Sequence, residues 1–140
     1  MQPVIFAILA AVTFGLWTVF HKLAAPYINH ILGAIIVSFT AVIFGSFFLV
    51  PEMKAGKLLT SPKGIIYLVL AGLCAFLIDY FALKAYAKGL PITIGGPLII
   101  GGSLAIAVVI GFALGDAITL PKIIALLLLI TGATILAVYA

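Results

Sequence analysis

Asp79 has the clearest capacity for chemistry in this sequence, because it interrupts the apolar stretch CAFLIDYFALKAYAKG (residues 74–89). The chain has only three acidic residues. A carboxylate near the middle of a bilayer costs about 2.5–3.5 kcal/mol on insertion scales, and it usually faces other helices or a water-filled cavity. Burial favours the protonated carboxyl, which would bring proton uptake and release into the physiological range, as a proton-coupled carrier requires. Asp79 is therefore the candidate site for a proton or a cationic substrate group; the alternative is a structural carboxylate, hydrogen-bonded to a Tyr or Thr.

The helix face that carries Asp79 contains several small residues, which suits a bundle interior or a cavity wall better than lipid contact. The neighbours at three, four and seven residues along a helix are Gly72, Ala75, Phe76, Ala82, Leu83 and Tyr86. Lys84 is five residues away and points elsewhere around the helix. We therefore expect the partner of Asp79 to come from another helix, from a substrate or from a proton.

A second set of polar side chains follows one face of the first apolar stretch, since residues four apart share a helix face. Its members are Thr13, Trp17 and His21, with Thr18 and Lys22 beside them. A hydroxyl, an indole and an imidazole on one wall predict a substrate path, and Thr13, Trp17 and Tyr80 are the expected wall residues. The alternative is that Trp17, His21 and Lys22 anchor the end of the helix at a membrane interface.

The stretch PITIGGPLIIGGSLAIAVVIGFALG (residues 91–115) is unusually rich in glycine around a proline. Proline lacks a backbone donor, and glycine lets a chain bend or another backbone approach. Broken helices at membrane depth often build transporter sites. The sequence predicts a helix break or gate formed by Gly95, Gly96, Pro97, Gly101 and Gly102.

Small residues recur every four positions further along the same stretch. They are Ser103, Ala107, Gly111 and Gly115. This spacing predicts a seam for close helix packing, either within the chain or between two chains.

The composition indicates that these residues belong to a membrane protein. Hydrophobic residues make up 66% of the chain and charged residues 7%, against about 45–50% and 25% in soluble domains. The lysines are scattered singly and form no basic patch, so a nucleic-acid partner is not expected. No HExxH, GxSxG, P-loop or metal-ligand cluster occurs, so neither an enzyme nor a metal or other cofactor is expected.

The sequence predicts an all-α, polytopic membrane protein with five transmembrane helices in a single domain, residues 1–140. A span needs about 20 apolar residues. The expected spans are 3–24, 31–50, 64–88, 92–115 and 121–140, with Pro51 ending the second.

Five spans place the termini on opposite sides of a membrane and divide the lysines between them. One side receives Lys54, Lys57, Lys63 and Lys122, and the other receives Lys22, Lys84 and Lys88. Such a small difference gives a weak positive-inside signal. Two arrangements therefore stay open. Either every chain inserts with its N-terminus inside, or chains insert in both orientations and pair head to tail.

Three segments resemble the EamA-type proteins of the drug/metabolite transporter superfamily. They are FGLWTVFHKLA in the first span, YFALKAYAKGLP at the third-to-fourth junction and GFALGDAITLPKIIALLLLITGATILA at the end. Asp116 stands where the family usually has Glu. The superfamily's small multidrug resistance exporters use a carboxylate in the first span, which is absent here.

Typical EamA-type members carry two five-span halves, so this chain resembles one half of a ten-helix transporter. The resemblance implies a bacterial or archaeal cell-membrane protein that works as a homodimer, parallel or antiparallel, with the fifth helix peripheral. It implies transport of a small metabolite or amphiphile across the lipid bilayer. Proton coupling through Asp79 is expected from the burial of that residue and not from the resemblance. The alternatives are a non-transporting assembly or regulatory subunit and a lipid translocase.

Overall fold

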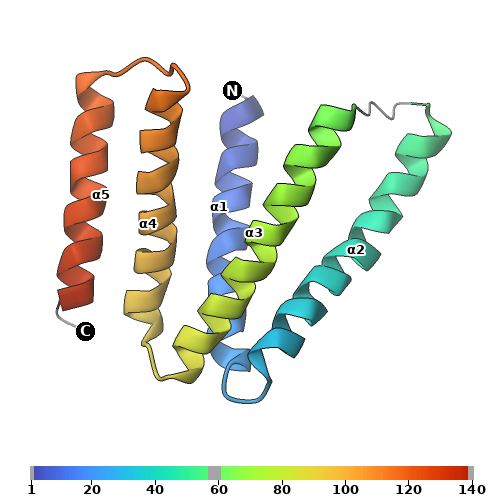
Figure 1. Ribbon diagram of the computed structural model, residues 1–140, viewed down its shortest axis with the longest axis horizontal. Helices are drawn as coiled ribbons and strands as arrows, with labels where there is room; N and C mark the ends of the chain where they lie inside the picture. Colours follow the sequence, from blue (N-terminus) through green and yellow to red (C-terminus); the bar gives the residue numbers. More distant parts are fainter. Residues whose placement is uncertain (1, 57–60, 139–140) are drawn as a thin grey trace.

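The computed structural model describes residues 2–56 and 61–138, and these residues form five helices and no strand (Figure 1). The helices are α1 (Gln2–Ala24), α2 (His30–Lys54), α3 (Pro62–Ala87), α4 (Ile92–Ala113) and α5 (Leu120–Val138). The prediction of an all-α chain is confirmed, and the helices follow the expected spans closely. Lys57 and the last two residues of the expected fifth span lie outside the described residues.

Four of the helices, α1 to α4, are long and apolar enough to cross a membrane. Their most apolar windows have mean hydropathies of 2.1 to 2.3. Helix α5 is also apolar but shorter, at 19 residues. The expectation of five spanning helices therefore holds for four of them by length and composition.

Local sequence explains where α2 and α3 begin and end. The Asn29 side chain accepts hydrogen bonds from the backbone N–H groups of Ile31 and Leu32, at 3.0 and 3.3 Å, and caps α2. Ser61 caps α3 by accepting from the Gly64 N–H at 3.1 Å. The turn after α3 contains Gly89 with a φ of 96°, a conformation that glycine adopts at little cost.

The prediction that Pro51 ends the second helix is wrong. Helix α2 includes Pro51 and continues to Lys54. Proline removes one backbone donor, but so close to the helix end little of the helix remains to be disturbed. The Ala55 N–H still closes the last turn by donating to the Pro51 carbonyl at 3.0 Å.

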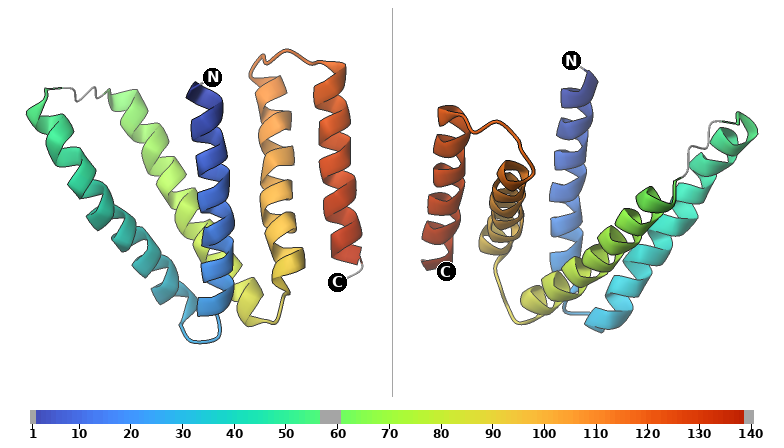
Figure 2. Two further views of the ribbon diagram at one scale, coloured as in Figure 1. Left: turned by 180° about the vertical axis from the view of Figure 1, so that it is seen from behind. Right: turned by 45° about the horizontal axis from the view of Figure 1, so that its top comes forward.

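The helices form two antiparallel pairs with α1 between them (Figures 1 and 2). Helix α2 packs along α3, α4 packs along α5, and α1 contacts both α3 and α4. Helices α2 and α3 lean away from the others towards the end that holds the N-terminus (Figure 2). We call this the N-terminal end; at the opposite, C-terminal end, α1, α2 and α3 converge.

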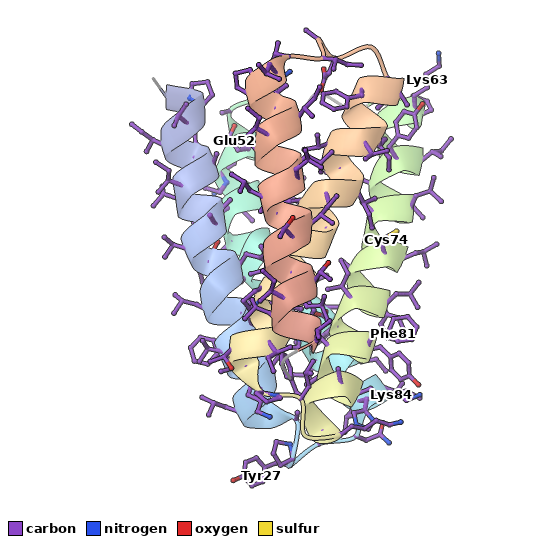
Figure 3. All side chains as sticks on the ribbon, turned by 90° about the vertical axis from the view of Figure 1, so that its left-hand side faces the viewer. Tyr27, Glu52, Lys63, Cys74, Phe81 and Lys84 are labelled. Atoms are coloured by element: carbon purple, nitrogen blue, oxygen red, sulfur yellow. The ribbon has the colours of Figure 1, made fainter. Side chains whose placement is uncertain are left out.

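The charged residues are distributed over the two ends as expected from five antiparallel helices. Figure 3 shows Glu52 and Lys63 at the N-terminal end, and Tyr27 and Lys84 at the C-terminal end. Cys74 and Phe81 point outwards from α3 between them (Figure 3). Both are exposed.

The buried core is small and lies at the C-terminal end. Its cluster comprises Ala25, Ala82, Leu83 and Tyr86, with Trp17, Ile28, Leu90 and Ile99 packed against it. Large apolar side chains elsewhere are exposed, for example Phe47 at 71% and Leu68 at 74%. The chain therefore buries little of its apolar surface by itself.

The glycine pair Gly95–Gly96 allows close packing, not the break expected from the sequence. Helix α4 is continuous through Pro97. A Cβ on Gly95 would lie 2.5 Å from Tyr86 Cε1, and a Cβ on Gly96 would lie 3.5 Å from Thr18 Cγ2. The pair therefore brings α4 against α3 and α1. Whether Pro97 and the other glycines act as a gate stays a prediction.

The predicted small-residue seam does not pack within the chain. Ser103, Ala107 and Gly115 are exposed, Gly111 is half-buried, and Gly115 lies beyond the end of α4. Helix α5 packs against another face of α4, where Gly101 approaches Ala133. A contact between two chains at the seam stays a prediction.

We predict that Gly95→Ala destabilises the protein by about 1–3 kcal/mol, the usual cost of overpacking. The added methyl group would meet the ring of Tyr86, which is 2% exposed and has little room to move. Gly102→Ala is the matched control, because a Cβ there has no neighbour within 4 Å. Denaturant unfolding of detergent-solubilised protein, followed by circular dichroism, measures both, and equal stabilities would contradict the packing role of Gly95.

Candidate functional site

The partners of Asp79 are Trp17 and His21, both on α1. The Trp17 indole N–H donates a hydrogen bond to Asp79 Oδ1 at 2.9 Å. His21 Nε2 lies 3.1 Å from the same oxygen. Asp79 is 5% exposed and His21 4%. An acid, an imidazole and an indole therefore form one buried cluster, which we call the Asp79 cluster.

The cluster depends on the packing of α1 against α3. Trp17 and His21 are four residues apart and so share a face of α1, which packs on α3. On α3 the expected inward face is observed near the C-terminal end, where Ala82, Leu83 and Tyr86 are buried beside Asp79. The small Ala82 side chain suits a close approach between the two helices.

Asp79 lies nearer to one helix end than the mid-membrane position expected from the sequence. Helix α3 runs from Pro62 to Ala87, so Asp79 is about 12 Å from its C-terminal end at 1.5 Å per residue. The cluster is thus close to the end where α1, α2 and α3 converge. The ends of α1 and α3, not the middle of the bundle, position this site.

The hydrogen bonds of His21 determine which ring nitrogen carries a fixed proton. Nδ1 lies 2.9 Å from the backbone carbonyl oxygen of Trp17, which can only accept, so Nδ1 is the donor. Nε2 faces Asp79 without the alignment of a hydrogen bond, and it has no other partner among the described residues. The contact between His21 Nε2 and Asp79 Oδ1 is therefore electrostatic rather than a directed hydrogen bond.

A proton shared by the His21–Asp79 pair would make this contact favourable. An unprotonated Nε2 and an ionised carboxylate would place two acceptors 3.1 Å apart. One proton produces either an imidazolium–carboxylate pair or a neutral imidazole beside a protonated carboxyl. Both forms have no net charge, which reduces the cost of burial.

Aromatic rings enclose the indole and imidazole groups. Phe14 stacks on Trp17 with ring centroids 5.1 Å apart, and the rings of Trp17 and His21 are 3.9 Å apart. Stacked rings bury apolar area and add about 0.5–1.5 kcal/mol per pair. They hold the two polar groups towards Asp79.

One pocket adjoins the cluster, and a second lies on a neighbouring face of α1. One of about 320 Å³ lies between α1 and α2, and Trp17 and His21 form part of its wall. Another of about 500 Å³ lies between α1, α4 and α5 and includes Thr18, Gly96 and Pro97. Both are mainly apolar, which suits small organic ligands or acyl chains. Asp79 does not line either pocket and lies behind Trp17 and His21.

Two of the four expected binding residues, Asp79 and Trp17, come together, and the other two lie apart. Thr13 is exposed, and its hydroxyl donates to the carbonyls of Leu9 and Ala10 in its own helix. The Tyr80 hydroxyl accepts from Lys84 Nζ at 3.3 Å, away from the Asp79 cluster.

The structure adds His21 to the site and gives Lys22 a different role. Sequence reasoning placed His21 on the polar face of the first span, with a membrane interface as the alternative, and it favoured the interface for Lys22. Lys22 Nζ donates to the Leu90 carbonyl at 2.8 Å and lies 5.7 Å from the centre of the Tyr86 ring. It therefore ties α1 to the α3–α4 turn.

No group of three or more potential metal ligands occurs among the described residues. Comparisons with protein-family models, with curated proteins and with solved structures found no match for this chain.

A double-mutant cycle tests whether His21 and Asp79 form a charge pair. We predict that His21→Gln destabilises the protein by roughly 3 kcal/mol, because it leaves a buried carboxylate without a counter-charge. Asp79→Asn should destabilise the protein less than His21→Gln does, since a neutral imidazole can remain. The double variant should regain much of the stability that His21→Gln loses. Additive effects in denaturant unfolding would contradict the pair.

Proposed function

We propose that this chain is a multi-pass membrane protein of a prokaryotic cell membrane. Support comes from the four long apolar helices and from the exposed apolar residues along their length. Exposed apolar patches larger than a few hundred Å² are rare in soluble monomers. A bilayer, together with a second copy of the chain, would cover this surface.

We propose further that the protein is a transporter of the EamA type for a small metabolite or amphiphile. The buried Asp79 cluster is the observation that carries this proposal. Ionisable residues within membrane helices are rare and usually mark a substrate or ion pathway. The cluster would accept a proton or a cationic group, and the neighbouring apolar pockets would hold the rest of the substrate.

The working unit in this proposal is a homodimer. Five helices leave the pockets beside the cluster open on one side, and a second copy would complete their walls, as repeats do in larger carriers. The exposed seam of α4 is the surface available for this contact. Among the described lysines three lie at each end of the bundle, so the orientation signal is weak and both parallel and antiparallel pairing stay open.

Lipid translocation is the second candidate. The pockets between α1 and α2 and between α1, α4 and α5 are mainly apolar and suit an acyl chain that slides along the bundle. A charge cluster is not needed for that activity, so the role of Asp79 separates the two candidates. A non-transporting subunit would show neither activity.

We predict that Asp79→Asn abolishes transport driven by a pH gradient in proteoliposomes while the protein stays folded. The amide cannot take up a proton or counter a cationic group. A screen of small metabolites and amphiphiles with the wild-type protein identifies the substrate first. Glu52→Gln is the control, because it removes an exposed acid at the far end of α2, and it should leave transport intact. Unchanged, pH-independent transport by Asp79→Asn would disprove coupling through this residue.

The dimer predicts cross-linking at the α4 seam. In a Cys74→Ser background, Ala107→Cys should form a disulfide-linked dimer under mild oxidation in membranes. Leu68→Cys is the matched control, since Leu68 is exposed on α3 and lies at a similar distance from the N-terminal end. Equal cross-linking at the two positions would argue against the seam. A tagged N-terminus found in equal amounts on both sides of the membrane would favour the antiparallel dimer, and an N-terminus found on one side alone would exclude it.

A further inference from the structure

We propose that His21, not Asp79, is the group in the Asp79 cluster that takes up and releases the proton, and that Asp79 is its fixed counter-ion. The inference concerns the chemistry of the cluster, and it rests on the proposed transport function only in giving that proton a use. It also predicts that the proton controls the contact between α1 and α3.

The geometry of His21 leaves one atom for proton exchange. Nδ1 is committed to the Trp17 carbonyl at 2.9 Å, whereas Nε2 is buried and lacks a hydrogen-bond partner among the described residues. Protonation of Nε2 adds a positive charge 3.1 Å from Asp79 Oδ1. The proton therefore arrives at an atom that already faces its counter-charge.

The surroundings of Asp79 favour its ionised form. Trp17 donates its indole N–H to the same oxygen, Oδ1, at 2.9 Å. A hydrogen bond of this kind stabilises a charged acceptor and is about twice as strong as one between neutral groups. A carboxyl that kept the proton would weaken this bond. The indole therefore favours placing the shared proton on the imidazole.

No other charged or titratable group among the described residues forms an ion pair or a hydrogen bond with the cluster. On α1, Lys22 donates to the Leu90 carbonyl. On α3, Lys84 donates to Tyr80, the Tyr86 ring packs against Gly95 of α4, and the buried Tyr86 hydroxyl has no hydrogen-bond partner among the described residues. On α2, His30 lies beside Tyr80. Within the described chain, the one acid–base contact of the cluster is that between His21 and Asp79.

The route to the cluster also favours His21. The imidazole forms part of the wall of the 320 Å³ pocket between α1 and α2, whereas Asp79 does not line it. A proton that enters along this pocket would therefore meet His21 before Asp79. Uptake converts a neutral imidazole and a carboxylate, with one net negative charge, into a neutral ion pair, and release returns the proton to water.

Release of the proton changes the force between α1 and α3. The protonated pair attracts across the helix contact, and the unprotonated pair places a lone pair against a carboxylate. Deprotonation therefore weakens the packing of α1 on α3 at the C-terminal end. The pair acts as a clamp that holds the two helices together while the proton is bound.

Solid-state NMR of protein labelled with ¹⁵N-histidine in lipid bilayers tests the inference. The chain has two histidines, so in a His30→Gln background all ¹⁵N-histidine signals come from His21. We expect Nδ1 to stay protonated across the pH range and Nε2 to change between protonated and unprotonated states. A ring that stays neutral at every pH, or a titration at Nδ1, would overturn the proposal.

Asp79→Asn in the same background tests the counter-ion. At neutral pH we expect loss of the imidazolium signal that the parent protein shows. Trp17→Phe is the comparison variant, because it removes the indole donor but keeps the carboxylate, and the imidazolium signal should weaken without being lost. An imidazolium population unchanged by Asp79→Asn would overturn the proposal. Since these signals require no transport, a failed transport assay with the expected spectra would reject the proposed function alone.

Discussion

The contact of Asp79 with Trp17 and His21 is the constraint on which the rest of the structure depends. A charge in an apolar bundle has to be paired, and its partners lie on α1, so α1 and α3 must meet at this level. The same region holds the only cluster of buried apolar residues found in the described chain, around Leu83 and Tyr86. Polar pairing and apolar packing therefore reinforce one another at the C-terminal end.

The opposite end of the bundle lacks such a constraint. Along the first half of α1 the described side chains are exposed, and α2 and α3 lean away from it (Figure 2). In a bundle whose helices are packed at one end and apart at the other, helices can move about the packed end. In a transporter, movement of the α2–α3 pair against α1, α4 and α5 would change access to the cluster, with Gly95 and Tyr86 near the point of rotation.

Hydrophobic runs and their breakers were enough to predict five helices and nearly all of their ends, because a helix of this composition depends mainly on local sequence. The effect of a proline depends on where in a helix it lies, so α2 does not end at Pro51 and α4 continues through Pro97. The inward orientation of Asp79 followed from its small neighbours. Its partners did not, because the rotation of α1 relative to α3 is a tertiary property, and His21 looked equally suited to an interface. The spacing of small residues likewise predicted a packing surface on α4, but α5 packs against another face of that helix.

Position in the bundle also explains why a histidine is suited to this cluster. An acid alone near the end of a membrane helix would either hold its proton permanently or require water to stay ionised. Pairing Asp79 with an imidazole keeps the buried site neutral while the proton is bound. The site then carries a net negative charge only after the proton has left. The energy of that charge is then available to separate α1 from α3. Because Trp17 both donates to Asp79 and accepts from His21 through its carbonyl, a movement of α1 alters both partners at once, which couples proton binding to helix packing without any further residue.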